Sequence, residues 1–344
     1  MPTLISIIVP VYNEQDNIGI VYGELKKLAS SLNNYEFEYI FTDNCSTDNT
    51  FSKLVEIARD DPMVRVARFA RNFGFHKSVL TGYRLSRGAA AVQIDADLQD
   101  PPELIRTFLE KWREGHDVVV GIRRLRHEPV AIQFMRKAYY RLLSRLDGPH
   151  LVHDAGDFRL VDASIIRSLR RIDDAHPYLR GLISSLARNQ TGVVYDRHER
   201  VHGESKFPLR KLVNMSVDGI VTHSRAPLKI AFFAGIGTAI LALSLILYFF
   251  YSRMFLSTQW PAGLATTQIL ILSGIALNGL FMGILGIYLG RIYDQVRRRP
   301  TTVIAQALNL DDLPREEGGD MAFDIGLPSV AAVPPQSHDA SKVD

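Results

Sequence analysis

Three side chains that end in oxygen ligands lie close together in the segment Ala91–Glu103, which reads AVQIDADLQDPPE. Asp95 and Asp97 are separated by one residue, and Gln99 follows them. Carboxylate and amide oxygens suit Mg²⁺ or Mn²⁺, and so small a set leaves coordination positions open for phosphate oxygens. The alternative is an acidic turn that caps a helix beginning near Glu103. The strand before these residues and the two prolines after them favour the metal site.

The elements around this motif predict where it lies. The apolar run Ala89–Ile94 ends directly at the acids and has the length of a buried strand. Helices separate it from four further expected strands, at Leu4–Val9, Phe37–Phe41, Val64–Arg68 and Val118–Val120. Strands that alternate with helices predict an α/β fold with a mostly parallel sheet covered on both faces. Ligands bind at the carboxyl ends of strands in such sheets, so the acids are expected to point into a site.

Several protein classes are excluded or disfavoured. The chain of 344 residues is 47% apolar and contains one cysteine, Cys45, which excludes an internal disulfide and a cysteine-rich zinc site. No glycine-rich dinucleotide fingerprint follows the first strand, and no phosphate-binding loop of the G-x-x-x-x-G-K-[ST] type exists. Residues 1–10 lack the basic start of a signal peptide, so we expect the first domain to stay in the cytosol.

Two long apolar stretches follow in the last third of the chain. Ile230–Tyr251 contains no charged residue over 22 positions, and Leu264–Leu289 contains none over 26. Because about 20 residues cross a bilayer, the pair predicts a transmembrane hairpin; the alternative is a buried helical pair in a soluble protein. Lysine and arginine flank the hairpin, whereas the connecting loop has only Arg253. The positive-inside rule therefore places both termini in the cytoplasm.

Six segments occur in an order typical of one family. They are PVYNE at Pro10–Glu14, DNCSTDNT at Asp43–Thr50, RNFG at Arg71–Gly74, DADLQDPPE at Asp95–Glu103, GDFRL at Gly156–Leu160 and RVHGESK at Arg200–Lys206. Together they resemble the GT-A, family 2 glycosyltransferases that load a sugar onto a polyprenyl phosphate. Dolichyl-phosphate mannose synthase and bacterial undecaprenyl-phosphate glucosyltransferases are the most similar groups. The resemblance covers the chain from about residue 5 to about residue 295.

The resemblance implies a nucleotide sugar donor and a divalent metal. The metal, Mg²⁺ or Mn²⁺, would be held by Asp95, Asp97 and Gln99 and would neutralise charge on the departing diphosphate. The base and ribose of the donor would be held by Pro10, Tyr12, Glu14 and Asp43; otherwise these residues form turns and helix caps. Asp95 would also contact the nucleotide sugar. A mobile segment would close over the diphosphate, with stabilising charges on Arg200 and Lys206.

Asp157 lies where the family places residues over the reacting sugar. A polyprenyl phosphate is already ionised near neutral pH, so it can attack the anomeric carbon without a general base. We therefore expect Asp157 to orient the sugar or the acceptor, with Arg159 as its ion-pair partner or as a phosphate contact. A simple surface pair is the alternative. The catalytic residues expected on these grounds are Asp97, Asp157, Arg200 and Lys206.

Basic residues gather after the fifth expected strand. Seven lysines and arginines lie between positions 123 and 145, against the single acid Glu128, with apolar residues at helical spacing among them. Such a helix suits an anionic membrane surface; nucleic acid is the competing partner, and the apolar spans favour the membrane. Arg123 and Arg126 are expected to bind the acceptor phosphate, because guanidinium groups match phosphate oxygens.

These observations divide the chain into four parts. We expect a GT-A catalytic domain at 1–207, juxtamembrane amphipathic helices at 208–229, two transmembrane helices at 230–290, and a cytosolic basic segment with a disordered tail at 291–344. The expected location is the plasma (inner) membrane, crossed twice, with a possible homo-oligomer through the spans.

The expected reaction is inverting transfer of a hexose, glucose from UDP-glucose, to undecaprenyl phosphate at the cytoplasmic face. The alternatives are a GDP-mannose or UDP-aminosugar donor, and a non-catalytic membrane protein that binds a nucleotide sugar. A processive polysaccharide synthase is disfavoured, because the sequence has no Q-x-x-R-W motif and only two apolar spans.

Overall fold

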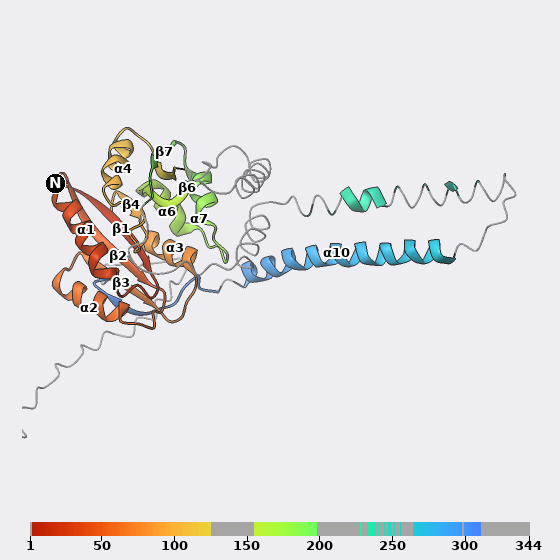
Figure 1. Ribbon diagram of the computed structural model, residues 1–344, viewed down its shortest axis with the longest axis horizontal. Helices are drawn as coiled ribbons and strands as arrows, with labels where there is room; N and C mark the ends of the chain where they lie inside the picture. Colours follow the sequence, from red (N-terminus) through yellow and green to blue (C-terminus); the bar gives the residue numbers. More distant parts are fainter. Residues whose placement is uncertain are drawn as a thin grey trace, which may run out of the picture.

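The structure is a computed structural model. It describes residues 2–124, 155–197, 264–297 and 299–310, together with scattered positions between 228 and 255. An α/β body occupies one end, and the long helix α10 (Leu264–Val296) projects away from it (Figure 1).

The centre of the body is an eight-stranded sheet with the order β7-β5-β6-β4-β1-β2-β3-β8. Strand β1 pairs in parallel with β2 and with β4, β2 with β3, and β5 with β7. The α/β prediction with a mostly parallel sheet is therefore confirmed. The strands are β1 (Thr3–Val11), β2 (Tyr35–Asp43), β3 (Val64–Phe69), β4 (Ala90–Gln93), β5 (Val118–Arg123), β6 (Ala155–Asp162), β7 (Gln190–Tyr195) and β8 (Ile304–Leu308).

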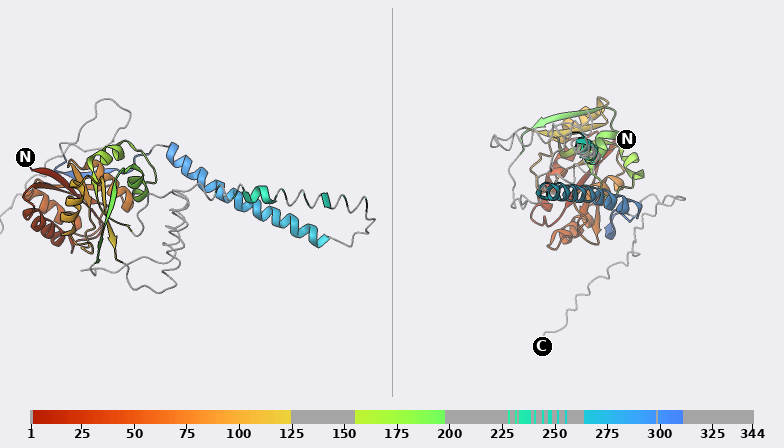
Figure 2. Two further views of the ribbon diagram at one scale, coloured as in Figure 1. Left: turned by 90° about the horizontal axis from the view of Figure 1, so that it is seen from above. Right: turned by 90° about the vertical axis from the view of Figure 1, so that its right-hand side faces the viewer.

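Helices cover both faces of this sheet (Figure 2). They are α1 (Ile18–Ser30), α2 (Thr50–Asp60), α3 (Phe75–Leu85), α4 (Leu104–Arg113), α6 (Ala163–Arg171) and α7 (Leu179–Leu186). Because side chains alternate along a strand, Ile7 of β1 packs with α1, α2 and α4, and the next residue, Ile8, packs with α3, α6 and α7. Both are buried, as expected for a strand in the middle of a covered sheet.

Strand β6 was not expected from the sequence. It runs antiparallel between β4 and β5 and pairs Gln93 with Arg159. Asp157, two residues before Arg159, is close enough to Asp95 for its charge to raise the pKa of that residue. The strand that carries GDFRL therefore enters the sheet at the edge where β4 ends.

The segment after α10 differs from the expected disordered tail. Residues 304–308 form β8, which pairs antiparallel with β3 at the edge of the sheet. Asn309, with φ of 55°, donates from Nδ2 to the carbonyls of Ala58 and Val64, both at 2.8 Å. The tail prediction is wrong for residues 301–310, because this edge of β3 offers unpaired backbone groups that a distant part of the chain can satisfy. Residues 311–344 lie outside the described part.

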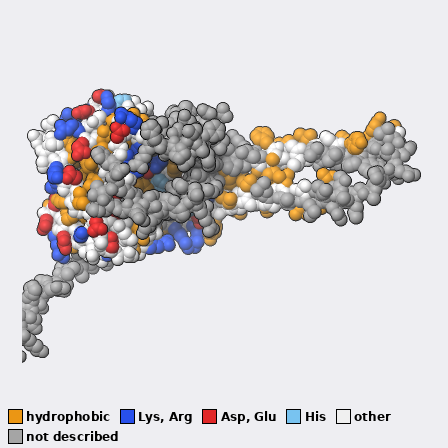
Figure 3. Space-filling model, in the orientation of Figure 1, with side chains coloured by type: hydrophobic (Ala, Val, Ile, Leu, Met, Phe, Trp, Pro, Cys, Tyr) orange, Lys and Arg blue, Asp and Glu red, His pale blue; other side chains and the backbone are white. Residues whose placement is uncertain are grey.

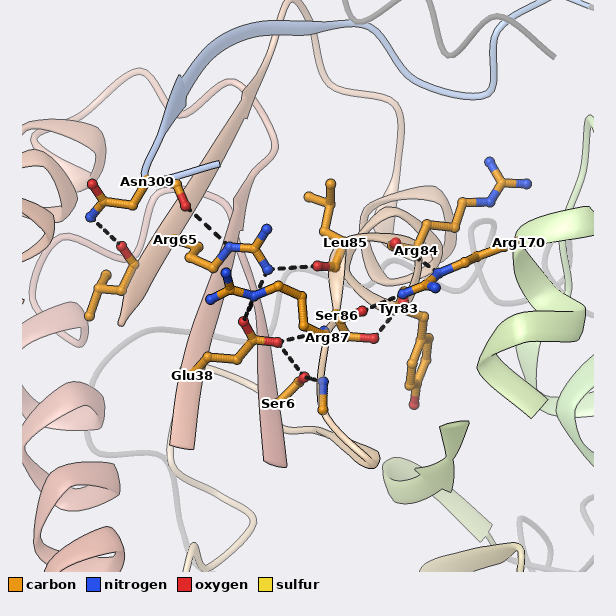
Figure 4. A network of polar contacts seen from close by, with 12 residues as sticks. Ser6, Glu38, Arg65, Tyr83, Arg84, Leu85, Ser86, Arg87, Arg170 and Asn309 are labelled. Atoms are coloured by element: carbon orange, nitrogen blue, oxygen red, sulfur yellow. Dashed lines mark hydrogen bonds and ion pairs between the residues drawn. The ribbon is translucent and has the colours of Figure 1, made fainter. Parts of the chain in front are cut away.

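A buried polar network joins β8 to the middle of the sheet (Figure 4). Arg65 and Glu38 are fully buried side by side, with Arg65 Nη1 donating to Glu38 Oε2 at 3.0 Å. Ser6 and Arg87 also donate to the Glu38 carboxylate. Arg65 Nε donates to the carbonyl of Asn309 at 3.2 Å. Burial alone would raise the pKa of Glu38, but these hydrogen bonds and the charge of Arg65 lower it.

We expect Glu38→Gln to lower the free energy of unfolding by about 3 kcal/mol, because it leaves Arg65 buried without a counter-charge. Unfolding of the detergent-purified protein by urea measures this loss. Glu36→Gln, an exposed position on the same strand, is the matched control and should change stability by less than about 0.5 kcal/mol. Equal stability of the two variants would show that the ion pair does not hold the sheet together.

Candidate active site

The loops that follow β1 and β2 are joined by hydrogen bonds. Asn13, at φ of 56°, receives hydrogen bonds at Oδ1 from the backbone N–H of Thr47 at 2.8 Å, and its own N–H donates to Ser46 Oγ at 2.9 Å. The backbone N–H of Glu14 donates to Thr50 Oγ1 at 2.8 Å. These hydrogen bonds therefore hold the PVYNE and DNCSTDNT motifs next to each other at the carboxyl edge of the sheet.

The four residues expected to hold base and ribose lie along this edge. Pro10 is near the end of β1 and pairs with Thr42 in register, while Tyr12 is exposed just beyond the strand. Asp43 is fully buried at the end of β2, where Oδ1 accepts the N–H of Ser46 at 3.0 Å and Oδ2 lies 3.4 Å from Arg68 Nε. The Glu14 carboxylate accepts a hydrogen bond from Asn17 Nδ2 at 2.6 Å.

Asp95, Asp97 and Gln99 form a tight turn directly after β4. Gln93 Nε2 donates to Asp95 Oδ1 at 3.0 Å, and the N–H of Gln99 donates to Asp97 Oδ1 at 3.2 Å. Leu98, between the last two, has φ of 51°, in the left-handed region of backbone conformation. Asp97 and Gln99 are buried.

Negative charge accumulates around Asp95. The pKa of Asp95 is raised to about 7, first by burial and then by the charges of Asp157, Asp100 and Asp97, against the opposing effect of Arg123. A cation bound here would relieve this repulsion, so the oxygen-only set of Asp95, Asp97 and Gln99 fits a hard divalent metal.

The candidate metal site offers two carboxylates and one side-chain amide, from Asp95, Asp97 and Gln99. Among the described residues, no group of three or more His, Cys, Asp or Glu side chains is arranged to hold a metal ion. Mg²⁺ is usually bound by one or two carboxylates together with water and the substrate's phosphates. The arrangement therefore fits a metal that binds together with a phosphorylated substrate.

Asp157 is paired with an arginine that the sequence did not indicate. Arg180 of α7 donates to both carboxylate oxygens, from Nε and from Nη2, each at 2.7 Å. Arg159 instead is buried and donates from Nη2 to the carbonyl of Gly156 at 2.9 Å. The partner of Asp157 is therefore Arg180 and not Arg159. Burial alone would raise the pKa of Asp157, but the hydrogen bonds and charge of Arg180 hold it well below its usual range.

Arg123, an expected phosphate ligand, is bound to a carboxylate in this structure. Its Nη2 donates to Asp100 Oδ2 at 3.3 Å, and its Nε donates to the hydroxyl of Tyr195 at 3.3 Å. Asp100 was visible in the sequence as the third acid of DADLQD, but nothing in the pattern indicated these partners. Three further residues with predicted roles, Arg126, Arg200 and Lys206, lie outside the described residues.

Comparison with known proteins identifies the family. Residues 6–170 match the family described as glycosyl transferase family 2. The uncharacterized glycosyltransferase YkcC of Bacillus subtilis (strain 168) is 39% identical over 311 residues, which are 89% of this chain and 95% of the relative. The chain belongs to glycosyl transferase family 2. This glycosyltransferase is also 32% identical over 309 residues to the bactoprenol glucosyl transferase of Shigella phage SfII, covering 88% of this chain and 98% of that protein.

Solved structures also resemble this glycosyltransferase. Glucosyl-3-phosphoglycerate synthase from Mycobacterium tuberculosis, in complex with Mn²⁺, uridine diphosphate and phosphoglyceric acid, aligns with a TM-score of 0.45 at 20% identity. The alignment covers 64% of this chain and 77% of that one.

Proposed function

We propose that this glycosyltransferase moves one hexose from a nucleotide diphosphate sugar, UDP-glucose, to a polyprenyl phosphate such as undecaprenyl phosphate at the cytoplasmic face of the membrane. The observation that carries the proposal is the 32% identity, over 98% of its length, to a protein named bactoprenol glucosyl transferase. The acids at the end of β4 and the ordered family motifs support the same reaction class.

In the proposed reaction, an oxygen of the lipid phosphate attacks the anomeric carbon of the sugar. The bond from that carbon to the diphosphate breaks, the nucleoside diphosphate leaves with the bonding electrons, and inversion gives a β-linked product. A divalent metal held by Asp95, Asp97 and Gln99 would supply charge neutralisation of the leaving diphosphate. Asp43 would accept a hydrogen bond from the base, and Glu14 one from the ribose. Asp157 would orient the sugar or the acceptor.

Helix α10 supports a membrane location. Among the described residues, one helix, with its candidate span at Ser273–Val296, is long and apolar enough to cross a bilayer. Most of its described residues are exposed, with Leu289 67% accessible, and hydrophobic side chains are seen along the projecting part of the molecule (Figure 3). Gly235, in the first apolar stretch, lies beside Phe281: a Cβ on the glycine would be 3.9 Å from the ring. This proximity supports the proposed two-helix hairpin.

The catalytic body lies at the carboxyl end of α10. The side chain of Gln295 accepts a hydrogen bond from the N–H of Ala175 at 3.0 Å, and Asp294 lies 3.0 Å from His176. Arg297 and Arg299 follow directly and are exposed. Basic residues at this end favour the cytoplasmic side, where we place the catalytic domain 1–207 and both termini.

Release of nucleoside diphosphate by the detergent-purified chain tests the proposal. The donors would be UDP-glucose, GDP-mannose and UDP-N-acetylglucosamine, each with Mg²⁺ or Mn²⁺ and with or without undecaprenyl phosphate. We expect release that requires both lipid and metal and is fastest with UDP-glucose. Faster release with another donor would show that a sugar other than glucose is transferred. Donor binding without release would favour a non-catalytic protein that binds a nucleotide sugar.

A further inference from the structure

Asp100 is a buried carboxylate that contacts three side chains from outside its own loop. Its side chain is 1% exposed. Oδ1 accepts the hydroxyl of Tyr195 and lies 3.3 Å from Arg197 Nε, while Oδ2 lies 3.3 Å from Arg123 Nη2. Arg123 ends β5, Tyr195 ends β7, and these two residues are partners in the parallel pairing of the strands. Asp100 therefore joins the ends of two strands to the loop that carries Asp97.

Close packing restricts the positions of the Tyr195 and Arg123 side chains around Asp100. The ring of Tyr195 lies against Gly121, where an added Cβ would be 2.8 Å from Cε1, and it contacts Phe158 edge to face at 6.0 Å. A Cβ on Gly156 would be 3.3 Å from Arg123 Nε. Side chains at these two glycines would push the tyrosine and the arginine away from Asp100. The sequence thus leaves space for the contacts.

The charges of this group do not cancel. Two guanidinium groups face one carboxylate, so the formal sum is 2 − 1 = +1. The carboxylate is buried, whereas the side chains of Arg123 and Arg197 are 32% and 25% exposed. The excess positive charge therefore reaches the surface through the arginines. Of the two arginines, Arg123 acts on Asp95, where its charge lowers a pKa that Asp100 raises.

We propose that Asp100 is a positioning residue that holds the guanidinium groups of Arg123 and Arg197 beside the metal-binding acids, where they receive the phosphate of the lipid acceptor. The inference rests on the proposed function and extends it by assigning a task to Asp100, Arg197 and Tyr195. An arginine held at one edge by a carboxylate keeps its remaining N–H groups for a phosphate, and less side-chain entropy is lost when the phosphate binds.

Steady-state kinetics of the full chain in detergent, with undecaprenyl phosphate and donor varied separately, test this role. Asp100→Asn should raise the KM for the lipid phosphate about tenfold and leave the KM for the donor within about twofold. Arg123→Gln should have a similar effect. In the double variant the KM for the lipid phosphate should rise by less than the product of the two single increases, because Asp100 acts in part through Arg123. A KM for the lipid phosphate that rises in the double variant by the full product of the two single increases would overturn the inference.

Asp117→Asn is the matched control, because Asp117 joins the opposite ends of the same two strands through the N–H of Arg188 at 3.1 Å. It should leave both KM values unchanged. If Asp100→Asn does not fold, Arg197→Gln, at a partly exposed side chain, should raise the acceptor KM about fivefold. A fall in kcat and in melting temperature with unchanged KM values would show a purely structural role and overturn the inference.

Equilibrium binding of undecaprenyl phosphate without donor separates this inference from the proposed function. A wild-type protein that neither binds the lipid phosphate nor releases nucleotide overturns both. A wild-type protein that transfers sugar, and an Asp100→Asn variant that binds the lipid phosphate equally tightly, overturn the inference alone. We expect the variant to bind the lipid phosphate about tenfold more weakly.

Discussion

Replacing Asp97 with asparagine is expected to lower kcat about 1,000-fold, the effect of losing about 4 kcal/mol of transition-state stabilisation. Asparagine has nearly the same shape and can still accept the N–H of Gln99, which Asp97 Oδ1 accepts at 3.2 Å, so the turn after β4 should persist. The lost negative charge weakens metal binding in the presence of nucleotide. Nucleotide release and Mn²⁺ titration with UDP present measure the two effects.

The control for this prediction is Asp16→Asn. Asp16 is an exposed acid in the loop after β1, and its replacement should leave kcat and the metal requirement within about twofold of wild type. Normal activity of Asp97→Asn with an unchanged metal requirement would contradict the assigned metal site. A lower melting temperature in Asp97→Asn, without weaker Mn²⁺ binding, would instead indicate that Asp97 stabilises the loop.

The second large effect is expected at Asp157. Asp157→Asn should lower kcat about 100-fold, because the amide cannot accept both N–H groups of Arg180, which bind the carboxylate at 2.7 Å each. The pKa of Asp157 is held well below its usual range, so the carboxylate is ionised throughout pH 5–8 in the folded enzyme. Because Asp157 stays ionised over this pH range, its titration does not lower kcat as the pH falls from 8 to 5. The pH profiles of kcat for wild type and variant should therefore have the same shape.

The pH profile distinguishes an orienting residue from a general base. A base poised near neutral pH would produce an acidic limb in the wild type that disappears in Asp157→Asn, and that result would contradict the orienting role. Arg180→Lys keeps the positive charge but removes the two-point contact, and should lower kcat about tenfold. Arg188→Lys, at an arginine 88% exposed, is the matched control and should have no effect.

Local sequence was sufficient for the centre of the site. The apolar run before Asp95 has strand length, and a strand that ends in acids within an alternating pattern can end only at the carboxyl edge of the sheet. The same argument placed Pro10 and Asp43 at that edge, because they end the first two strands. These predictions depend on periodicity and on chain order, both of which are contained in a few consecutive residues.

The partners of the charged residues required the tertiary structure. Arg180 lies 23 residues after Asp157. Asp100 meets Arg123 and Tyr195 at the ends of two other strands, and Arg197 in the segment after β7. No local pattern distinguishes Arg180 from Arg159 as the partner of Asp157. The choice depends on the tertiary structure, in which Arg159 is buried and binds the carbonyl of Gly156, while α7 brings Arg180 to Asp157.

The sequence by itself determined the fold class, the family and the strand-end acids, because each follows from residue order and spacing over short segments. The tertiary structure decided three further features: the insertion of β6 beside β4, the pairing of β8 with β3, and the link from Asp100 to the ends of β5 and β7. Each joins segments far apart in the chain. Strand pairing and ion pairing over such separations depend on which edges and charges remain unsatisfied once the sheet has formed, and a single sequence does not contain that information in any one segment.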